Sequence, residues 1–478
     1  MAMNALARFG LLPMALYLAS AASVVVVTGC AEQKPEVRLA TLNELKALVP
    51  KELLNVPPED KAAKARYEKL IALAKKIKPE DANRVTANWS ALWQISKGGK
   101  TNVKVTEAEQ IALVKRLWKT NPHLLSDLEA VLASGPLAVP SGLEMEDADS
   151  SRAQIDLTRM LAFSSESYVA ASDFGMATRL VLLLYRLVDA MRSGSGSIFP
   201  YLATNIVMGI STSTTDLYAQ SKFPAKDCSV ILRSLQPAPK EDQNLVAAIK
   251  GEFLEYTLPD LASNKPKLTG AGSYDALETV KKAARKTQFA ISNASVPLSK
   301  LDRTSYNELE QDANDVLRHI YQSNYKGPYK SMDLVTAIGN TLDAASPAKP
   351  PTPNTEDVRS ALNRIHNSLG RLVVGQYTWD ILPTLSCGWR AERDLTRILL
   401  ASRVYRASHG GKLPPTVAGF VPILGAWPTN PFDGQPFTYL PKQEKVYGVG
   451  NDLTDHGGDL GNGIVSGKDA GISLQLTR

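Results

Sequence analysis

Four aspartates near the C-terminus have the chemistry of a divalent-cation site. Asp452, Asp455 and Asp459 lie close together, and Asp469 follows ten residues after the third. Carboxylate oxygens are ligands that Ca²⁺ prefers, and the glycines and asparagine around them let backbone carbonyls turn toward the same ion. The spacing is not that of an EF-hand loop. The alternative is a solvated turn rich in Asp and Gly that holds no ion, since such turns are common.

The N-terminus has the order of features expected of a secretory signal. Arg8 precedes an apolar stretch from Phe9 to Val27, and small residues lead up to Cys30. The sequence Val27-Thr28-Gly29-Cys30 resembles the bacterial lipobox. This resemblance implies that residues 1–29 are a signal peptide and that Cys30 carries a diacylglyceryl thioether. The alternative is an N-terminal transmembrane helix, because the apolar stretch is just long enough to cross a bilayer.

Both interpretations place residues 31–478 outside the cytoplasmic face of the inner membrane. Acyl chains contribute about 0.8 kcal/mol of binding free energy per buried CH₂, so we expect the lipid anchor to hold the protein firmly at the membrane. Ala31 stands where sorting signals for the inner membrane have Asp, and by resemblance to those rules this favours the outer membrane of the bacterial envelope. Residues 30–60, with prolines at 35, 50, 57 and 58, are expected to form the anchor and tether.

Two further cysteines remain once Cys30 carries lipid. In an oxidising compartment Cys228 and Cys387 could form a disulfide, although the sequence does not show whether they are close. The alternative is a pair of buried, unreactive thiols.

The stretch from Lys61 to Lys78 has the spacing of an amphipathic helix. It carries seven basic side chains and a single acidic one, Glu68. A basic helix near a lipid anchor could touch anionic headgroups. The alternative is an ordinary solvated face.

The rest of the chain predicts a mainly α-helical protein, built as a helical bundle or as stacked helix pairs. We expect an N-terminal helical region over residues 61–135, with a capping box from Thr106 to Glu109, and a helical body over residues 151–385. Leu180 to Met191 is strongly apolar, but charged residues interrupt it, so the pattern favours a central bundle helix over a membrane span.

Residues 388–478 are expected to form a small α+β domain. A helix over Ala391–His409 ends at Gly410-Gly411, a glycine signal for a helix C-terminus. Two short strands, Phe437–Leu440 and Lys445–Val449, flank a four-residue turn, which predicts a hairpin.

The order of these pieces resembles the globular head of the major pseudopilin of type II secretion systems. The resemblance covers about residues 390–470 and implies that the acidic loop binds Ca²⁺. The matching positions are Tyr405, His409, Pro414, Asn430, Pro431, Gly434, Pro436, Tyr439, Tyr447, Gly450 and Asp452. Asn430 replaces the Asp of that family, and Leu453 replaces a Gly. The N-terminus also lacks the prepilin cleavage pattern, so the chain is not expected to be a polymerising pilin subunit.

Composition and motifs exclude several function classes. The net charge of +6 comes from 54 basic and 48 acidic residues, which is too mild to indicate nucleic acid as a partner. The sequence contains no HExxH zinc motif, no GxSxG nucleophile motif and no phosphate-binding glycine loop. We therefore expect a non-catalytic interaction or scaffold lipoprotein, near secretion or pilus-type machinery. The alternatives are an envelope hydrolase or a ligand-binding lipoprotein with a site in the helical body.

Overall fold

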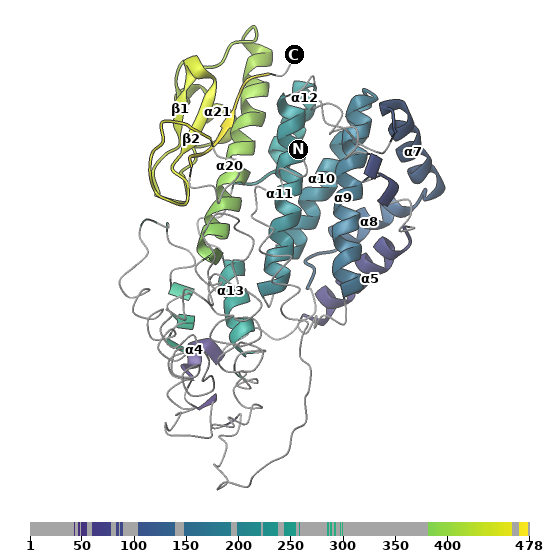
Figure 1. Cartoon of the computed structure of the whole chain (residues 1–478), viewed down its shortest axis with the longest axis vertical. Coiled ribbons are helices and arrows are strands. Elements are labelled where there is room, and N and C mark those ends of the chain that lie inside the picture. Colours follow the sequence, from purple (N-terminus) through teal and green to yellow (C-terminus); the bar gives the residue numbers. More distant parts are fainter. Residues whose placement is uncertain are drawn as a thin grey trace, which may run out of the picture.

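The computed structural model describes residues 49–54, 60–77, 104–138, 148–192, 198–220, 223–237, 243–254, 381–460 and 468–476, with isolated residues between 43 and 88 and between 258 and 299. Cys30, the predicted signal peptide and residues 300–380 of the expected helical body lie outside this part of the chain. The described part is mainly helical, as predicted, with one small sheet (Figure 1). None of its helices is long and apolar enough to cross a membrane.

The described N-terminal helices are α4 (Lys51–Leu54), α5 (Lys61–Lys75), α7 (Glu107–Thr120) and α8 (Leu124–Ala133). The predicted capping box starts α7. The Thr106 hydroxyl accepts a hydrogen bond from the Glu109 amide at 3.2 Å, and the Glu109 carboxylate accepts one from the Thr106 amide at 2.7 Å. Two orphan amides at the helix start are thereby satisfied.

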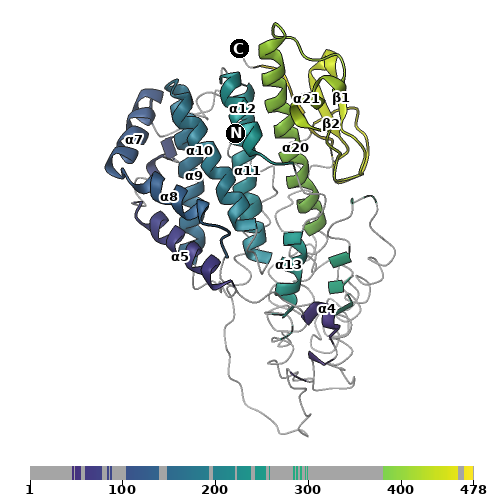
Figure 2. The ribbon, with the colours of Figure 1, turned by 180° about the vertical axis from the view of Figure 1, so that it is seen from behind.

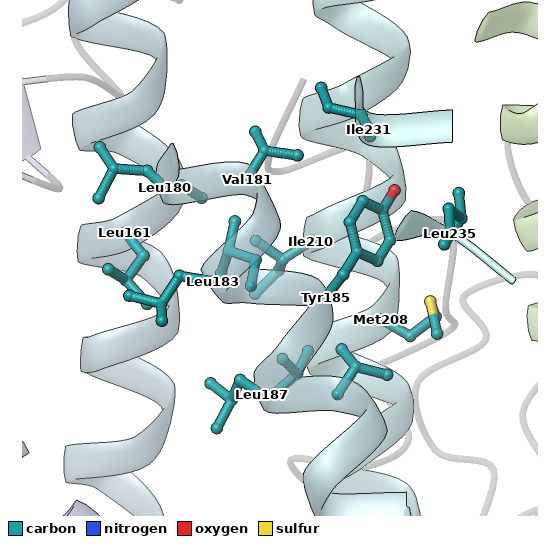
Figure 3. Packing of buried hydrophobic residues seen from close by; sticks show 14 of the residues in the cluster. Leu161, Leu180, Val181, Leu183, Tyr185, Leu187, Met208, Ile210, Ile231 and Leu235 are labelled. Carbon is teal, nitrogen blue, oxygen red and sulfur yellow. The ribbon is translucent and has the colours of Figure 1, made fainter. Parts of the chain in front are cut away.

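A bundle of longer helices follows: α9 (Ala148–Ala170), α10 (Phe174–Arg192), α11 (Ile198–Gln220), α12 (Ala225–Ser234) and α13 (Gln243–Glu252). Helix α10 packs against α8, α9, α11 and α12. Leu180, Leu183 and Leu187 of α10 are at most 1% exposed and point into the core (Figure 3). Arg179 and Arg186 lie on its exposed side. The stretch predicted to be a central bundle helix is therefore one.

The last long helix, α20 (Ile381–Ser408), starts ten residues before the position predicted from the sequence. The expected domain boundary near residues 385–388 falls inside it. Pro383 and Gly388 disfavour a helix interior, but Pro383 lies in the first turn, where proline is tolerated because its missing N–H has no partner there. Gly410 and Gly411 follow the helix with φ of 60° and 80°, as the glycine signal predicts.

The C-terminal segment adds η6 (Val417–Gly419), α21 (Val421–Leu424), β1 (Thr438–Leu440), η7 (Pro441–Gln443), β2 (Lys445–Gly448) and β3 (Ala470–Ser473). The strands form an antiparallel sheet in the order β1-β2-β3, with Tyr439 opposite Val446 and Val446 opposite Ile472. The predicted hairpin is confirmed, and Glu444 closes its turn with φ of 50°. Strand β3 was not predicted.

Helix α20 lies between the helical bundle and the sheet. It packs against α11 and α12 on one side and against β3 and α21 on the other. Both views place the sheet at the opposite edge of the bundle from α5 and α7 (Figures 1 and 2). Buried side chains from Tyr67 in α5 to Leu474 after β3 form one continuous hydrophobic core.

Candidate functional site

The acidic loop at the C-terminus is organised around Asp469. This side chain is only 2% exposed. Its Oδ1 accepts a hydrogen bond from the His456 amide at 3.1 Å, and its Oδ2 accepts one from the Gly458 amide at 2.6 Å. Both carboxylate oxygens therefore hold the backbone of the loop in place.

The other three aspartates of the predicted calcium site also have protein donors. Asp452 Oδ2 lies 2.8 Å from His456 Nε2, and this contact lowers the pKa of the Asp452 carboxyl. Asp459 Oδ2 lies 2.6 Å from Lys468 Nζ, which lowers its pKa too. Asp455 accepts a hydrogen bond from the Gly457 amide at 2.7 Å.

These residues do not fit a calcium ion. Ca²⁺ requires six to eight oxygen ligands around one point. Here the carboxylate oxygens instead contact an ammonium group, an imidazole and backbone amides. In the described part of the chain, no three His, Cys, Asp or Glu side chains are grouped so that they could hold a metal ion. The calcium prediction for Asp452, Asp455, Asp459 and Asp469 therefore finds no support in the described part of the loop, where hydrogen bonds use the same oxygens.

The two departures from the pseudopilin pattern have different structural consequences. Asn430 is 1% exposed, and its Nδ2 donates to the Val449 carbonyl at 3.0 Å while its Oδ1 accepts from the Phe432 amide at 3.3 Å. An ionised aspartate could not donate the first of these bonds. Leu453 has φ of 59°, a conformation in which glycine would be unstrained.

Cys228 and Cys387 are separate buried thiols, so the disulfide considered from the sequence is not formed. Cys387 Sγ donates to the Pro431 carbonyl at 3.3 Å and accepts from Arg390 Nη2 at 3.4 Å. Burial raises the pKa of the Cys228 thiol to about 11, although Arg403 acts in the opposite direction. Both thiols face protein groups, which is the alternative that the sequence left open.

Several residues that carry the pseudopilin resemblance lie close together at the C-terminal end of α20. His409 stacks on Tyr405 with the ring centres 3.7 Å apart, and its Nδ1 lies 2.9 Å from the Tyr405 carbonyl. Tyr439 donates its hydroxyl to the Pro414 carbonyl at 2.7 Å and packs edge-on against Phe420. These contacts form an aromatic core for the segment that follows α20.

The most distinctive polar feature of the molecule is a set of arginines on α20. Arg393 donates to the Gln236 carbonyl at 2.7 Å and to Asp189 at 3.0 Å. Arg397 donates to the Leu235 carbonyl at 3.0 Å. These bonds satisfy carbonyls that follow the end of α12 and tie α20 to the helical bundle.

The same set of arginines reaches the C-terminal segment. Arg397 Nη2 donates to the Leu424 carbonyl at 3.3 Å. Arg406 donates to the Leu474 carbonyl at 3.3 Å and pairs with Glu444 at 2.9 Å. Arg397 thus contacts both the bundle and the C-terminal segment.

Arg397 is buried, and its charge is compensated within α20 itself. Its side chain is 7% exposed, and its Nη1 lies 3.4 Å from the Asp394 carboxylate. Burial lowers the pKa of the guanidinium, and Asp394 partly offsets this effect. Loss of this guanidinium would take a buried donor away from the Asp394 carboxylate and from two backbone carbonyls.

This arginine set was missed from the sequence. Arg390, Arg393 and Arg397 follow one another at spacings of three and four residues, so they share one face of a helix that also buries leucines and isoleucines. That combination is the signal that could have identified a buried polar interface. The arrangement positions two parts of the chain relative to each other.

Comparison with protein-family models, with curated proteins and with solved structures gives no match for this chain.

Proposed function

We propose that this protein is a non-catalytic lipoprotein of the bacterial envelope, anchored through Cys30, that presents its C-terminal segment (residues 409–476) to a protein partner. The observation that supports this function best is the arginine set of α20, which bonds to backbone carbonyls of the bundle and of the C-terminal segment. A binding surface that is held rigidly by the rest of the protein binds its partner more tightly, because little conformational entropy is lost in ordering it on binding.

The side chains that could do chemistry support the same interpretation. The acidic loop uses its carboxylates to fix its own backbone, and the two thiols contact protein groups in the interior. The two thiols are at most 1% exposed and so lack the access to a substrate that a nucleophile needs. The C-terminal segment instead exposes apolar side chains: Val421 and Leu476 are each 39% exposed. The link to secretion or pilus-type machinery is proposed on the sequence resemblance alone.

The anchor is tested by the Cys30→Ser variant. We expect the unaltered protein to be in the membrane fraction, to incorporate labelled palmitate and to resist extraction by high salt. The Cys30→Ser variant should lose the label. A label that persists in the variant, or a protein that is never labelled, would contradict lipid attachment at Cys30.

The interaction surface is tested with a photo-crosslinking amino acid at Val421 or Leu476 in intact cells. The matched control position is Ala130, which is exposed on α8 at the opposite edge of the bundle. We expect a defined adduct from the first two positions, identified by mass spectrometry as an envelope protein. The adduct from Leu476 should be lost when Val421→Asp is introduced into the same chain. Adducts of equal yield from Ala130, or none from the C-terminal segment, would refute the proposed surface. Deletion of residues 388–478 is not a clean test, because it removes most of α20.

A further inference from the structure

Helix α5 is the first long helix that the structure describes after the proposed lipid site, and its two faces differ in polarity. Tyr67, Leu70 and Ile71 are at most 5% exposed and pack into the core beside α8 and α9. Asp60 caps the helix by accepting hydrogen bonds from two backbone amides at 3.0 Å. The buried face and the cap fix which side of α5 is turned outward.

The outward side carries four exposed lysines, which we call the α5 basic face: Lys61, Lys69, Lys75 and Lys76. Glu68 is the one exposed acidic residue among them. Within the described part of the chain, none of the four lysines forms an ion pair or a side-chain hydrogen bond. By contrast, the Arg66 side chain is partly buried and donates to the Pro136 carbonyl at 2.7 Å.

The residues between these lysines are small. Ala62, Ala65 and Ala72 are exposed, so no bulky side chain would keep the helix away from a flat surface. Val49 and Leu53 are buried and α4 precedes α5, so the free tether is at most residues 31–48, which span at most about 65 Å when extended. The face is therefore within reach of the membrane that holds the lipid anchor.

We infer that the α5 basic face lies against an anionic lipid bilayer and orients the helical bundle on it. The inference rests on the proposed lipid anchor, which holds the protein at the membrane while the lysines set its orientation. Each lysine near an anionic surface strengthens the contact by about fivefold, and the effect falls off within about 10 Å in ordinary salt. Because the sheet lies at the opposite edge of the bundle, this orientation turns the C-terminal segment away from the bilayer (Figures 1 and 2).

The test uses the full acylated protein reconstituted into vesicles, with an environment-sensitive fluorophore on a cysteine at Ala72. The two thiols already present are buried, so labelling at pH 7 is selective. Quenching by headgroup spin-labelled lipids reports proximity to the bilayer. The matched control places the fluorophore at Ala407, which is exposed at the end of α20.

In vesicles with 30% anionic lipid at 50 mM salt, we expect quenching at Ala72 and little at Ala407. The quenching should disappear in neutral vesicles and at 500 mM salt. A Lys69→Gln, Lys75→Gln, Lys76→Gln variant should weaken the contact by about two orders of magnitude. The same charge removed elsewhere, as Lys226→Gln, Lys412→Gln, Lys442→Gln, should leave it unchanged.

Three results would overturn the inference. They are equal quenching at Ala72 and Ala407, quenching that does not change with anionic lipid or salt, and an equal decrease of membrane contact in the two triple variants. Failure of the lipid anchor is seen separately, because the protein would then not float with neutral vesicles. Even in that case, salt-sensitive flotation with anionic vesicles still tests the α5 basic face.

Discussion

At the scale of single residues, one buried amide shows how a departure from a familiar pattern can be structural. Asn430 bonds to Val449 and Phe432 from a position that is 1% exposed. Replacement by Asp, the residue of the pseudopilin pattern, would turn a carboxylate oxygen toward the Val449 carbonyl. We expect Asn430→Asp to lower the free energy of unfolding at pH 7 by about 2–3 kcal/mol, since a donor is lost and a charge is buried. Urea denaturation followed by circular dichroism measures this effect.

Asp433 provides the control for that substitution. Its Oδ1 accepts from the Gln435 amide at 2.9 Å in an exposed turn, and an amide oxygen can accept the same bond. Asp433→Asn should change the stability by less than about 0.5 kcal/mol. If both variants behave alike, the donor role assigned to Asn430 is wrong.

The acidic loop leads to a prediction about metal ions. The carboxylates of Asp452, Asp459 and Asp469 are bonded to His456, Lys468 and backbone amides, and Ca²⁺ would have to break those bonds. We expect 2 mM Ca²⁺ to move the thermal midpoint by less than 1 °C relative to the same protein in a chelator. Asp469→Asn, in contrast, should lower the stability by about 1–3 kcal/mol, because one amide would then face an NH₂ group. A calcium-dependent rise of several degrees that is lost in Asp469→Asn would restore the cation site.

The buried thiol of Cys228 predicts a specific alkaline instability. An unfolded thiol ionises near pH 8.5, whereas burial raises the pKa of the folded one to about 11. Below pH 8.5 both states bind the proton, so the thiol has no effect on the pH dependence. Between pH 8.5 and 11 only the unfolded state loses the proton, so stability falls with rising pH, by about 3 kcal/mol at the upper end.

The measurement is the free energy of unfolding from pH 8 to 11 in the unaltered protein and in Cys228→Ala. The variant should have a flatter profile in this window. Thiol titration of the same samples should find Cys228 and Cys387 unreactive in the native protein at pH 8 and both reactive in urea. A profile that is equally steep in Cys228→Ala would assign the alkaline instability to other groups.

At the scale of elements, the packing of α20 against the rest of the chain depends on its buried arginines. Arg397→Ala would remove from the interior the donor that the Asp394 carboxylate and the carbonyls of Leu235 and Leu424 share. We expect it to lower the free energy of unfolding by about 3–5 kcal/mol. Arg397→Lys should rescue little, because an ammonium group cannot reach three acceptors in the same fork geometry.

The exposed pair of Arg179 and Glu129 is the control for Arg397. Its two hydrogen bonds are both 2.7 Å long, so its geometry is at least as good, but the arginine is 42% exposed. Arg179→Ala should therefore lower stability by no more than about 1 kcal/mol. Equal losses in the two arginine variants would show that burial does not set the value of these bonds.

The contrast between predicted and unpredicted elements follows from the range of the forces that form them. The α7 capping box, the glycine end of α20 and the hairpin depend on residues within nine positions of each other, so local sequence specifies them. The start of α20 and strand β3 depend on partners far away in the chain, such as β2 for β3. The calcium prediction rests on residue types alone, whereas the contacts of His456 and Lys468 with the same carboxylate oxygens appear only in three dimensions.

At the scale of the whole molecule, α20 belongs to the bundle and to the C-terminal segment at once. Its buried side chains include Trp389, Leu395, Ile398 and Leu399, each at most 4% exposed. Burial of each large apolar side chain contributes about 1.5–3 kcal/mol, so these four alone approach the 5–15 kcal/mol by which a typical domain is stable. The bundle is therefore expected to depend on α20 for its stability.

Two truncated chains test this dependence. A chain that ends at residue 380 lacks α20, and we expect it to lose cooperative unfolding and to be degraded rapidly by protease. A chain that ends at His409 keeps the contacts of α20 with α11 and α12 and loses only the C-terminal segment. It should retain most of the helical circular dichroism signal, with a lower denaturation midpoint, because Arg406 loses the Leu474 carbonyl and Glu444. A stable, protease-resistant bundle in the shorter chain would show that the bundle does not need α20 for its stability. The proposal that the bundle holds the C-terminal segment rigidly through α20 would then be contradicted.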